Sequence, residues 1–476
     1  MTVLVTGRDL DRRSLVRVAR GDEPVELDDA AVARMRETRS VLEEALDAGL
    51  PIYGSSTAVG VLKRAAIERT AAADYSSRVL RTHRVAQGPA ASGDLVRATM
   101  VRLANAFAEG SPGVRPLLAE RLVDALNGDD APVVRTLGSV GEADLAQMAD
   151  LGLGLFGDVR LEAGEGLAIV GSNAFSTAAS ALAVADAEVL LDTLDVAGAL
   201  SLEALAARPT LLHSAIGRVR PYPGLRRALA RLGELLEGSA VHEASTPRNL
   251  QDPLSFRNLP QILGACRDVL EHVDAQLGIE LNASQGNPVV LADEGEVISV
   301  ANFEILPLAA ALDYLRLVLA TAVGTSAERT VKLLETSWSG LPTGLTSSGD
   351  AADPGLAYWG IAVQALAADA RLLAQPVSFE TVSTAHAEGI EDRATFASLT
   401  ARRTAEMVES SMRVVSLELA TAAQAAELRG HALGRGTGDA LTKIRSVVPY
   451  LVPGDAVPDA ETLVDLVRAG EFATER

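Results

Sequence analysis

Cysteine is nearly absent from this 476-residue chain, which contains only Cys266. A single cysteine excludes a disulfide within the chain and any metal site built from several cysteines, and it is typical of a reducing compartment. The six histidines show no spacing that would suit metal ligands, so no metal site is predicted. We interpret Cys266 as a small buried apolar residue rather than as a nucleophile.

Positive charge is also scarce, because 43 Lys and Arg face 63 Asp and Glu, a formal net charge of -20. This balance argues against nucleic acid or an anionic membrane surface as a partner. The first residues show no charged leader followed by an apolar run, so we expect a cytoplasmic protein. The most apolar stretch, Ile305–Val323, is interrupted by a proline and two charged residues, which favours a buried core helix over a membrane span.

Sequence signals for β-strands are few, whereas signals for helices recur along the chain. An apolar residue recurs every three or four positions before Gly430, at Val408, Met412, Val415, Leu419, Ala422 and Ala426. The same pattern, rich in alanine, predicts helices within Leu95–Ala108, Ser176–Leu194, Gln261–Leu277, Pro307–Thr321 and Ala362–Leu373. One hairpin is expected where Val289–Leu291 and Val297–Val300 flank an acidic turn. These signals predict an all-α bundle with minor β-hairpins.

The segment Gly138–Ala149 reads Gly-Ser-Val-Gly-Glu-Ala-Asp-Leu-Ala-Gln-Met-Ala. It resembles the Gly-Ser-Val-Gly-Ala-Ser-Gly-Asp-Leu signature of the histidine and phenylalanine ammonia-lyase family, which also includes aminomutases. Glu142 and Ala143, followed by Asp144, stand where that family has Ala-Ser-Gly and then Asp. In the family, the tripeptide closes on itself and loses water to form the electrophilic methylidene-imidazolone cofactor. The chain lacks the serine and the glycine, so we predict that this cofactor is absent.

Further segments are similar to the family in the same order, from about residue 20 to 450. They are Tyr53–Gly60, Arg81–Arg84, Glu165–Ile169, Gln251–Arg257, Gly286–Pro288, Asn302–Phe303, Ser339–Pro342 and Gly389–Asp392. The resemblance implies the ammonia-lyase fold with a long central helical bundle. It also implies an N-terminal part, 1–200, that carries active-site loops, and a long-helix part, 201–476. Family members are tetramers whose active sites combine several subunits, so a homotetramer is expected.

Tyr53 and His83 are the candidate catalytic residues. Tyr53 lies in a turn rich in Gly, Ser and Thr, where a phenol can project into a cleft, and the family uses the matching Tyr as its base. A nearby cation would be needed to lower the phenol pKa from about 10. His83, whose reference pKa is about 6.5, falls where the family has a Ser-His pair and is expected to relay protons. A packing role for Tyr53 is the alternative.

Arg257 is the candidate for binding a substrate carboxylate, because a guanidinium grips a carboxylate with two hydrogen bonds and stays charged. An ion pair with Asp252 or another local acid is the alternative for this residue. The other positions that match the family's pocket are Gln251, Asn287, Phe303 and Glu391. Amides there would supply hydrogen bonds and Phe303 an apolar wall. His386, in a segment whose spacing departs from the family, is interpreted as a loop residue.

Other departures fall on positions that hold or assist the family's electrophile. Gly171-Ser172-Asn173 replaces Asn-Gly-Thr, Leu254 stands where a second catalytic Tyr is expected, and Glu304 follows the Asn-Phe pair. Ordinary ammonia-lyase activity is therefore doubtful, because acid-base catalysis alone contributes roughly 10²- to 10⁴-fold. The leading hypothesis is an electrophile-independent lyase or cyclase acting on a carboxylate-bearing biosynthetic intermediate. In it, Tyr53, assisted by His83, takes an acidic proton or protonates a leaving group.

Two alternatives stay open at this point. The chain is a catalytically inactive homologue that binds or supports an active lyase, or it forms a different cofactor from Glu142-Ala143-Asp144. The second is disfavoured, because neither Glu nor Ala has a β-hydroxyl group to lose.

Overall fold

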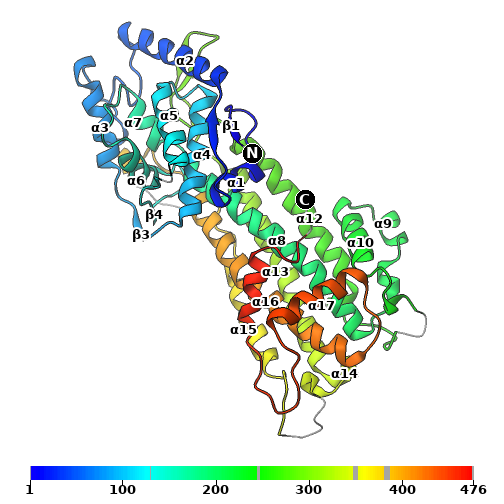
Figure 1. Cartoon of the computed structure of the whole chain (residues 1–476). Helices are drawn as coiled ribbons and strands as arrows, with labels where there is room; N and C mark the ends of the chain where they lie inside the picture. Colours follow the sequence, from blue (N-terminus) through cyan, green and yellow to red (C-terminus); the bar gives the residue numbers. More distant parts are fainter. Residues whose placement is uncertain (1, 129, 244–246, 347–351, 380–385, 474–476) are drawn as a thin grey trace. The chain divides into compact units, whose positions relative to one another are not determined.

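Helices dominate the computed structural model, which describes residues 2–128, 130–243, 247–346, 352–379 and 386–473 (Figure 1). The α-helices are α1 (Arg12–Arg20), α2 (Asp29–Asp47), α3 (Ala72–Thr82), α4 (Gly93–Glu109), α5 (Pro116–Asn127), α6 (Leu145–Phe156), α7 (Glu165–Val170), α8 (Ala174–Leu205), α9 (Ala215–Val219), α10 (Pro223–Leu235), α11 (Leu254–Arg257), α12 (Leu259–Glu280), α13 (Leu306–Leu334), α14 (Thr336–Ser339), α15 (Trp359–Leu373), α16 (Ala397–Arg429), α17 (Arg435–Val447) and α18 (Glu461–Arg468). Short 3-10 helices are η1 (Gly60–Leu62), η2 (Arg69–Ala71), η3 (Pro209–Leu212), η4 (Ala240–His242), η5 (Thr343–Leu345) and η6 (His386–Gly389). The predicted all-α class is confirmed.

Three two-stranded pairings make up the named sheets of the described chain. The expected hairpin is present, because β5 (Val289–Leu291) pairs antiparallel with β6 (Glu296–Ile298). β3 (Gln87–Ala90) pairs antiparallel with β4 (Arg135–Leu137). β1 (Val3–Val5) and β2 (Val25–Leu27) pair in parallel, with α1 between them in the sequence, so this pair is not a hairpin.

The described residues form two compact units, each assembled from separated segments. The first unit comprises Met1–Ala185, Val273–Asp313 and Pro376–Arg402, and the second comprises Asp186–His272, Tyr314–Gln375 and Arg403–Arg476. This division differs from the contiguous parts, 1–200 and 201–476, that the resemblance implies. Four of the five unit boundaries fall inside α8, α12, α13 and α16, and the fifth follows α15, so a residue's place in the sequence does not by itself give its unit.

In the first unit, α4 packs against α1 and α5, and α3 packs against α6 and α7 (Figure 1). The local sequence fixes the ends of these helices. Asp11 caps α1 by accepting a hydrogen bond from the backbone N–H of Ser14, and α5 begins with Pro116, whose missing N–H costs nothing at that position. α4 is buried from Val96 to Ala108. α4 is thus the core element of the first unit, the unit that also contains the loops of the candidate site.

In the second unit, an ion pair joins three long helices. Arg329 of α13 donates from Nη2 to Glu418 Oε2 of α16 at 2.8 Å, and Ser201 of α8 donates to Glu418 Oε1 at 2.7 Å. Both charged side chains are almost fully buried. The predicted apolar side of the helix from Val408 to Ala426 is buried within the chain. The chain itself therefore covers this side of the helix, without a second subunit.

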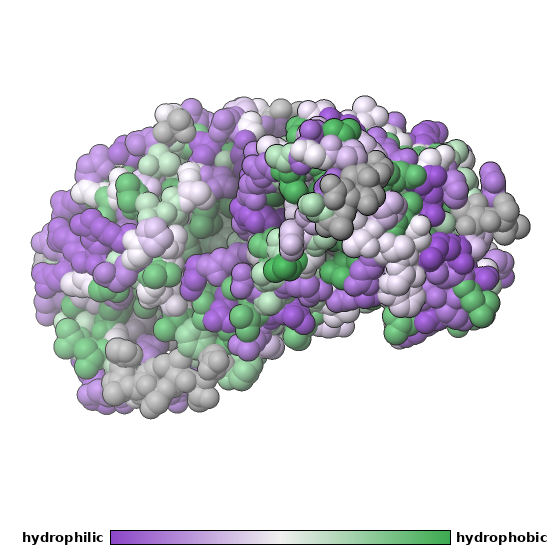
Figure 2. Space-filling view, turned by 90° about the horizontal axis from the view of Figure 1, so that it is seen from below, coloured by the Kyte–Doolittle hydropathy of each residue, from purple (hydrophilic) through white to green (hydrophobic). Residues whose placement is uncertain are grey.

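Two helical stretches, Glu165–Leu205 and Leu306–Leu334, have the length and apolar composition of membrane spans. The most apolar window is 89% buried in the first stretch and 56% buried in the second. Core helices of water-soluble proteins meet the same criteria, so the two stretches are weak evidence for a membrane. Figure 2 shows hydrophobic residues among hydrophilic ones on the face it presents.

Candidate active site

The Tyr53 side chain lies on a tight loop in the first unit. The carbonyl oxygen of Ile52 accepts hydrogen bonds from the backbone N–H groups of Ser55, Ser56 and Thr57. Gly54 has a φ of +73°, and a Cβ at this position would lie 2.2 Å from Leu167 Cδ2, so glycine is required there. The loop fixes the backbone on both sides of the phenol.

Two phenols are anchored to neighbouring backbone groups of this loop. Gly60 donates its N–H to the Tyr53 hydroxyl at 2.8 Å, and Val59 donates its N–H to the Tyr75 hydroxyl at 2.8 Å. Burial raises the pKa of the Tyr53 phenol above its usual value, the Gly60 hydrogen bond lowers it, and the charge of Glu391 raises it again. The expectation of a phenol pKa lowered by a nearby cation is therefore wrong. The Tyr53 phenol is therefore protonated near neutral pH and can donate a proton.

The 138–144 loop, whose sequence resembles the family's cofactor-forming signature, is held by several hydrogen bonds. Gly141 O accepts from Asn173 Nδ2 and from Thr395 Oγ1, each at 2.9 Å. Asp144 is fully buried and accepts from Ser139 Oγ at 2.9 Å and from the backbone N–H of Ser176 at 2.7 Å. Burial raises the pKa of Asp144. Ala143 has a φ of +63°, a conformation uncommon for alanine.

Glu142 occupies the centre of this altered loop. Its side chain is half-buried, and its Oε1 is buried without a hydrogen-bond partner among the described residues. Burial, followed by the charge of Glu304, raises the pKa of Glu142 to about 7; Arg393 lowers it, and a side-chain hydrogen bond with Glu304 and the charge of Glu391 raise it. Arg393 Nε lies 3.4 Å from Glu304 Oε2. A carboxyl group that titrates near neutrality is suited to accept or donate a proton.

Glu391 is brought near both Tyr53 and Glu142, because its charge acts on the pKa of each group. Contacts between the residues that follow the Tyr53 loop and the residues that precede Glu391 support this proximity. Lys63, just after η1, donates from Nζ to Ala387 O at 3.3 Å and lies 3.1 Å from Glu388 Oε2. The structure thus gathers Tyr53, Glu142 and Glu391, with Glu304 and Arg393, in the first unit.

His83 ends α3, and its Nδ1 lies 2.8 Å from Val79 O, so that this nitrogen carries the proton. Among the described residues no hydrogen bond joins the His83 ring to Tyr53, so assistance of Tyr53 by His83 stays a prediction. Phe303 is partly buried in the turn before α13. His386 lies in η6, a single 3-10 turn, in line with its interpretation as a loop residue.

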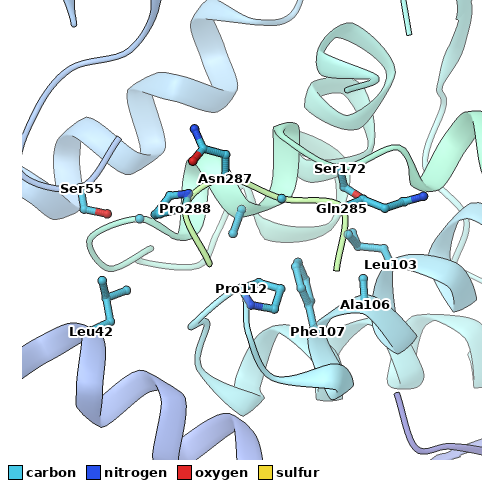
Figure 3. Close-up of a pocket in the computed structure, with 13 residues that line it drawn as sticks. Leu42, Ser55, Leu103, Ala106, Phe107, Pro112, Ser172, Gln285, Asn287 and Pro288 are labelled. Atoms are coloured by element: carbon cyan, nitrogen blue, oxygen red, sulfur yellow. The ribbon is translucent and has the colours of Figure 1, made fainter. Parts of the chain in front are cut away.

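Asn287 lines a cavity of about 20 Å³ in the first unit, together with Ser55, two residues after Tyr53 (Figure 3). Asn287 Oδ1 accepts from Val300 N at 2.9 Å and from Ser299 Oγ at 3.2 Å, so this oxygen ties the β5–β6 hairpin. Ser55 Oγ and Gln285 Oε1 are buried there without a hydrogen-bond partner. A cavity of this size holds about one water molecule, which would satisfy such groups.

Arg257 and Gln251 belong to the second unit, where both line an open cavity of about 330 Å³. Arg257 Nε donates to the backbone oxygen of Asp252 at 2.7 Å, and not to its carboxylate. The Asp252 carboxylate instead accepts from Arg208 N at 2.8 Å and from Asn249 Nδ2 at 3.3 Å. The alternative of an ion pair between Arg257 and Asp252 is therefore not what the structure shows.

Several groups of the site carry no sequence signal that would have identified them. Tyr75, Thr395 and Arg393 act through contacts with residues from other segments of the chain. Asn173 and Glu304 were noticed only as departures from the family. Cys266 has no part in the site, because it is fully buried and burial raises the pKa of its thiol to about 12.

Comparison with known proteins shows to which family the chain belongs. The family described as aromatic amino acid lyase matches residues 10–160 and 157–446. A histidine ammonia-lyase of Symbiobacterium thermophilum is 33% identical over 99% of this chain and 98% of its own length. Another, of Deinococcus radiodurans, is 31% identical over 94% of this chain and 90% of its own. The chain belongs to the aromatic amino acid lyase family.

A solved structure with a closely similar fold is that of the ergothioneine-degrading enzyme ergothionase from Treponema denticola, in complex with desmethyl-ergothioneine sulfonic acid. It is 27% identical, covers 100% of both chains and has a TM-score of 0.93. The predicted ammonia-lyase fold is thus confirmed.

The methylidene-imidazolone group expected of this family does not fit the residues present in the 138–144 loop. Its formation removes a serine hydroxyl as water and joins a glycine nitrogen to a carbonyl carbon. Glu142 and Ala143 offer no β-hydroxyl group, and Asp144 N already donates to Ser172 O at 2.9 Å. The loop carries the half-buried carboxyl group of Glu142.

Proposed function

We propose that this family member catalyses an elimination, or the reverse addition, without the methylidene-imidazolone cofactor. Glu142 acts as the base and Tyr53 as the acid. The substrate is a small carboxylate-bearing molecule whose carboxylate Arg257 holds. Gln251, Asn287, Phe303 and Glu391 complete the pocket, and His83 relays protons. The protein works as a cytoplasmic homotetramer, which brings the anion-binding residues of one subunit to the acid-base groups of another.

The observation that carries the proposal is the position of the Glu142 carboxyl group together with its raised pKa. This carboxyl group lies in the segment that resembles the family's cofactor-forming signature, and its pKa is raised to about 7 by burial and by the charge of Glu304. A base whose pKa is close to the working pH is deprotonated often enough to react and basic enough to take a proton. Tyr53, with its raised pKa, supplies the complementary acid.

The elimination step balances with these two groups. The Glu142 carboxylate takes a proton from a carbon adjacent to the substrate's leaving-group carbon, and the C–H electron pair forms the new C=C bond. The C–N bond breaks, and the departing nitrogen takes its electron pair and the Tyr53 proton. Transfer of the proton from Glu142 to the Tyr53 phenolate then restores both groups. Without an electrophile, the substrate must have an acidic C–H bond or a nitrogen that departs easily.

Paired tyrosine variants test the assignment of Tyr53. Tyr53→Phe is expected to lower kcat by about 10²- to 10⁴-fold, because the departing nitrogen loses its proton donor. Tyr75→Phe is the matched control, since its hydroxyl also accepts one N–H from this loop. Amine release from α-amino acids and their N-substituted derivatives measures turnover. Equal effects of the two substitutions would show that Tyr53 only holds the loop.

Intact mass tests the cofactor statement separately. The expected mass is that of the unmodified sequence, and loss of one or more water molecules would contradict the proposal. If neither Tyr53→Phe nor Glu142→Gln altered turnover, the acid-base roles would be overturned, and if the wild-type protein released no amine from any of these substrates, the inactive-homologue alternative would replace this proposal. A stable hetero-oligomer with an intact lyase would then be expected on co-purification.

A further inference from the structure

The open cavity of the second unit contains a second arginine besides Arg257. Arg208 precedes η3, and Arg257 ends α11. The cavity, of about 330 Å³, is also lined by Thr210, Gln251 and Asn258, and by the nearly fully buried Asp252. These groups offer two positive charges and several hydrogen-bond donors to one ligand.

Both guanidinium groups are fixed at one end on the same short segment. Arg208 Nε donates to Asn249 O at 2.8 Å, and Arg257 Nε donates to Asp252 O at 2.7 Å. Each bond uses the Nε–H and leaves the terminal Nη groups for a ligand. A guanidinium held in this way loses less side-chain entropy when it binds an anion.

The two charges have no carboxylate partner in the described part of the chain. Asp252 is nearly fully buried, and its oxygens are used by the Arg208 N–H and the Asn249 amide. Elsewhere many arginines are paired, as in Arg267 with Asp192 and Asp195. In a chain of net charge -20, two unpaired guanidiniums beside one cavity attract an anion from solution.

We infer that this cavity binds a small molecule with two negative charges, carried by two carboxylates or by a phosphate, and that Arg208 recognises the second charge. The inference rests on the proposed function, because Arg257 is the residue assigned there to the substrate carboxylate. It narrows the substrate class from any small carboxylate-bearing molecule to one with two negative charges. A single guanidinium suffices for one carboxylate, so the second arginine is the feature that requires a second charge.

Binding of simple anions to the full-length protein tests this inference, with calorimetric titration of succinate, inorganic phosphate and acetate. Wild-type protein is expected to bind succinate or phosphate at least about tenfold more tightly than acetate. Arg208→Gln is expected to remove this preference while changing acetate affinity by less than about threefold. Arg208→Lys retains part of the preference, which a purely structural role of Arg208 would not produce. Arg257→Gln weakens all three anions.

Arg220→Gln is the matched control, because it removes one exposed arginine of the same unit outside this cavity. It is expected to leave all three affinities unchanged. Tighter succinate binding assigns two carboxylates to the ligand, and tighter phosphate binding assigns a phosphate group. No preference for dianions in the wild type, or a preference that survives Arg208→Gln, overturns the inference. The Tyr53→Phe and Glu142→Gln variants should retain the preference for dianions. Failure of the proposed elimination is detected separately, because these two variants would then have the same turnover as the wild type.

Discussion

At the scale of single residues, Glu142 combines a cost in stability with a use in chemistry. Its carboxyl group is half-buried beside Glu304, with one oxygen lacking a hydrogen-bond partner among the described residues. An amide or an apolar side chain at this position would make the folded protein more stable than a half-buried carboxyl group with an unsatisfied oxygen. Arrangements of this kind are typical of functional sites, where strain on a charged group sets its pKa.

The pH dependence of activity should follow Glu142. As a base it must be deprotonated, so kcat/KM is expected to fall as the pH drops through about 7, the pKa of this group. Glu142→Gln is expected to lower kcat by about 10²- to 10⁴-fold and to abolish the change near pH 7. Glu120→Gln, at an exposed position of the same unit, is the control. A wild-type profile that is flat between pH 6 and about 8 would contradict the assignment.

The pH dependence of the free energy of unfolding provides a second test of the Glu142 pKa. The folded-state pKa of Glu142, about 7, lies above its usual value of 4.5, so the folded protein binds this proton more tightly than the unfolded chain. The contribution of Glu142 to the free energy of unfolding therefore falls as the pH rises from about 4.5 to 7. Glu142→Gln should be more stable than wild type at pH 8 and similar at pH 4.5. Urea unfolding at both pH values measures the difference, and equal stability at pH 8 would mean that the carboxylate is well solvated.

At the scale of elements, the 138–144 loop is wedged against the start of α16. Phe396 N donates to Val140 O at 2.9 Å, and a Cβ on Gly141 would lie 2.7 Å from Ala397 N and 2.1 Å from Thr395 Oγ1. Gly141 also has a φ of +89°. The position of Glu142 therefore depends on glycine at the preceding residue.

Gly141→Ala is expected to destabilise the protein by about 2–4 kcal/mol, from backbone strain and from the clash with α16. Gly49→Ala supplies the control, since Gly49 also has a positive φ, +77°, but its added Cβ would meet nothing within 4 Å. That variant should cost roughly 1 kcal/mol. Urea unfolding compares the two, and similar losses would show that the loop moves easily away from α16.

The Arg329–Glu418 pair is the other element-scale feature, because it connects α8, α13 and α16 in the second unit. Glu418→Gln leaves a buried guanidinium uncompensated and is expected to cost about 3–5 kcal/mol. Glu461→Gln, which breaks the exposed pair with Arg413, should cost at most about 1 kcal/mol. Free energies of unfolding in urea provide the comparison. Comparable values for the two variants would mean that water reaches the buried pair.

Sequence reasoning predicted the long helices and the β5–β6 hairpin because their apolar residues repeat over enough positions to show a period. The β1–β2 pair escaped it, since strands of three residues are too short for a period to be seen. For the site, motif resemblance located Tyr53, Glu142 and Arg257 individually. The raised pKa of Tyr53 and the approach of Glu304, Glu391 and Arg393 to Glu142 arise from tertiary contacts, which no local pattern encodes.

At the scale of the whole molecule, the remaining question is what covers the apolar side chains that one chain leaves exposed. The apolar side of α16 from Val408 to Ala426 is already buried within the chain, so it needs no second subunit to cover it. In contrast, Ile361 and Leu372 of α15 are 70% and 64% exposed. Exposed apolar side chains on one helix favour an interface between subunits, in line with the proposed homotetramer.

Charged substitutions on α15 should therefore break the assembly without unfolding the chain. Wild-type protein is expected to sediment as four chains, and the Ile361→Asp, Leu372→Asp double variant as a smaller species, because a buried unpaired carboxylate opposes association. Thr442→Asp adds a carboxylate at an exposed position of α17 and should leave the tetramer intact. If the active site combines several subunits, the double variant also loses turnover while its circular dichroism stays helical. A monomeric wild-type protein that retains turnover would contradict the shared site, since Tyr53 and Arg257 would then have to act within one chain.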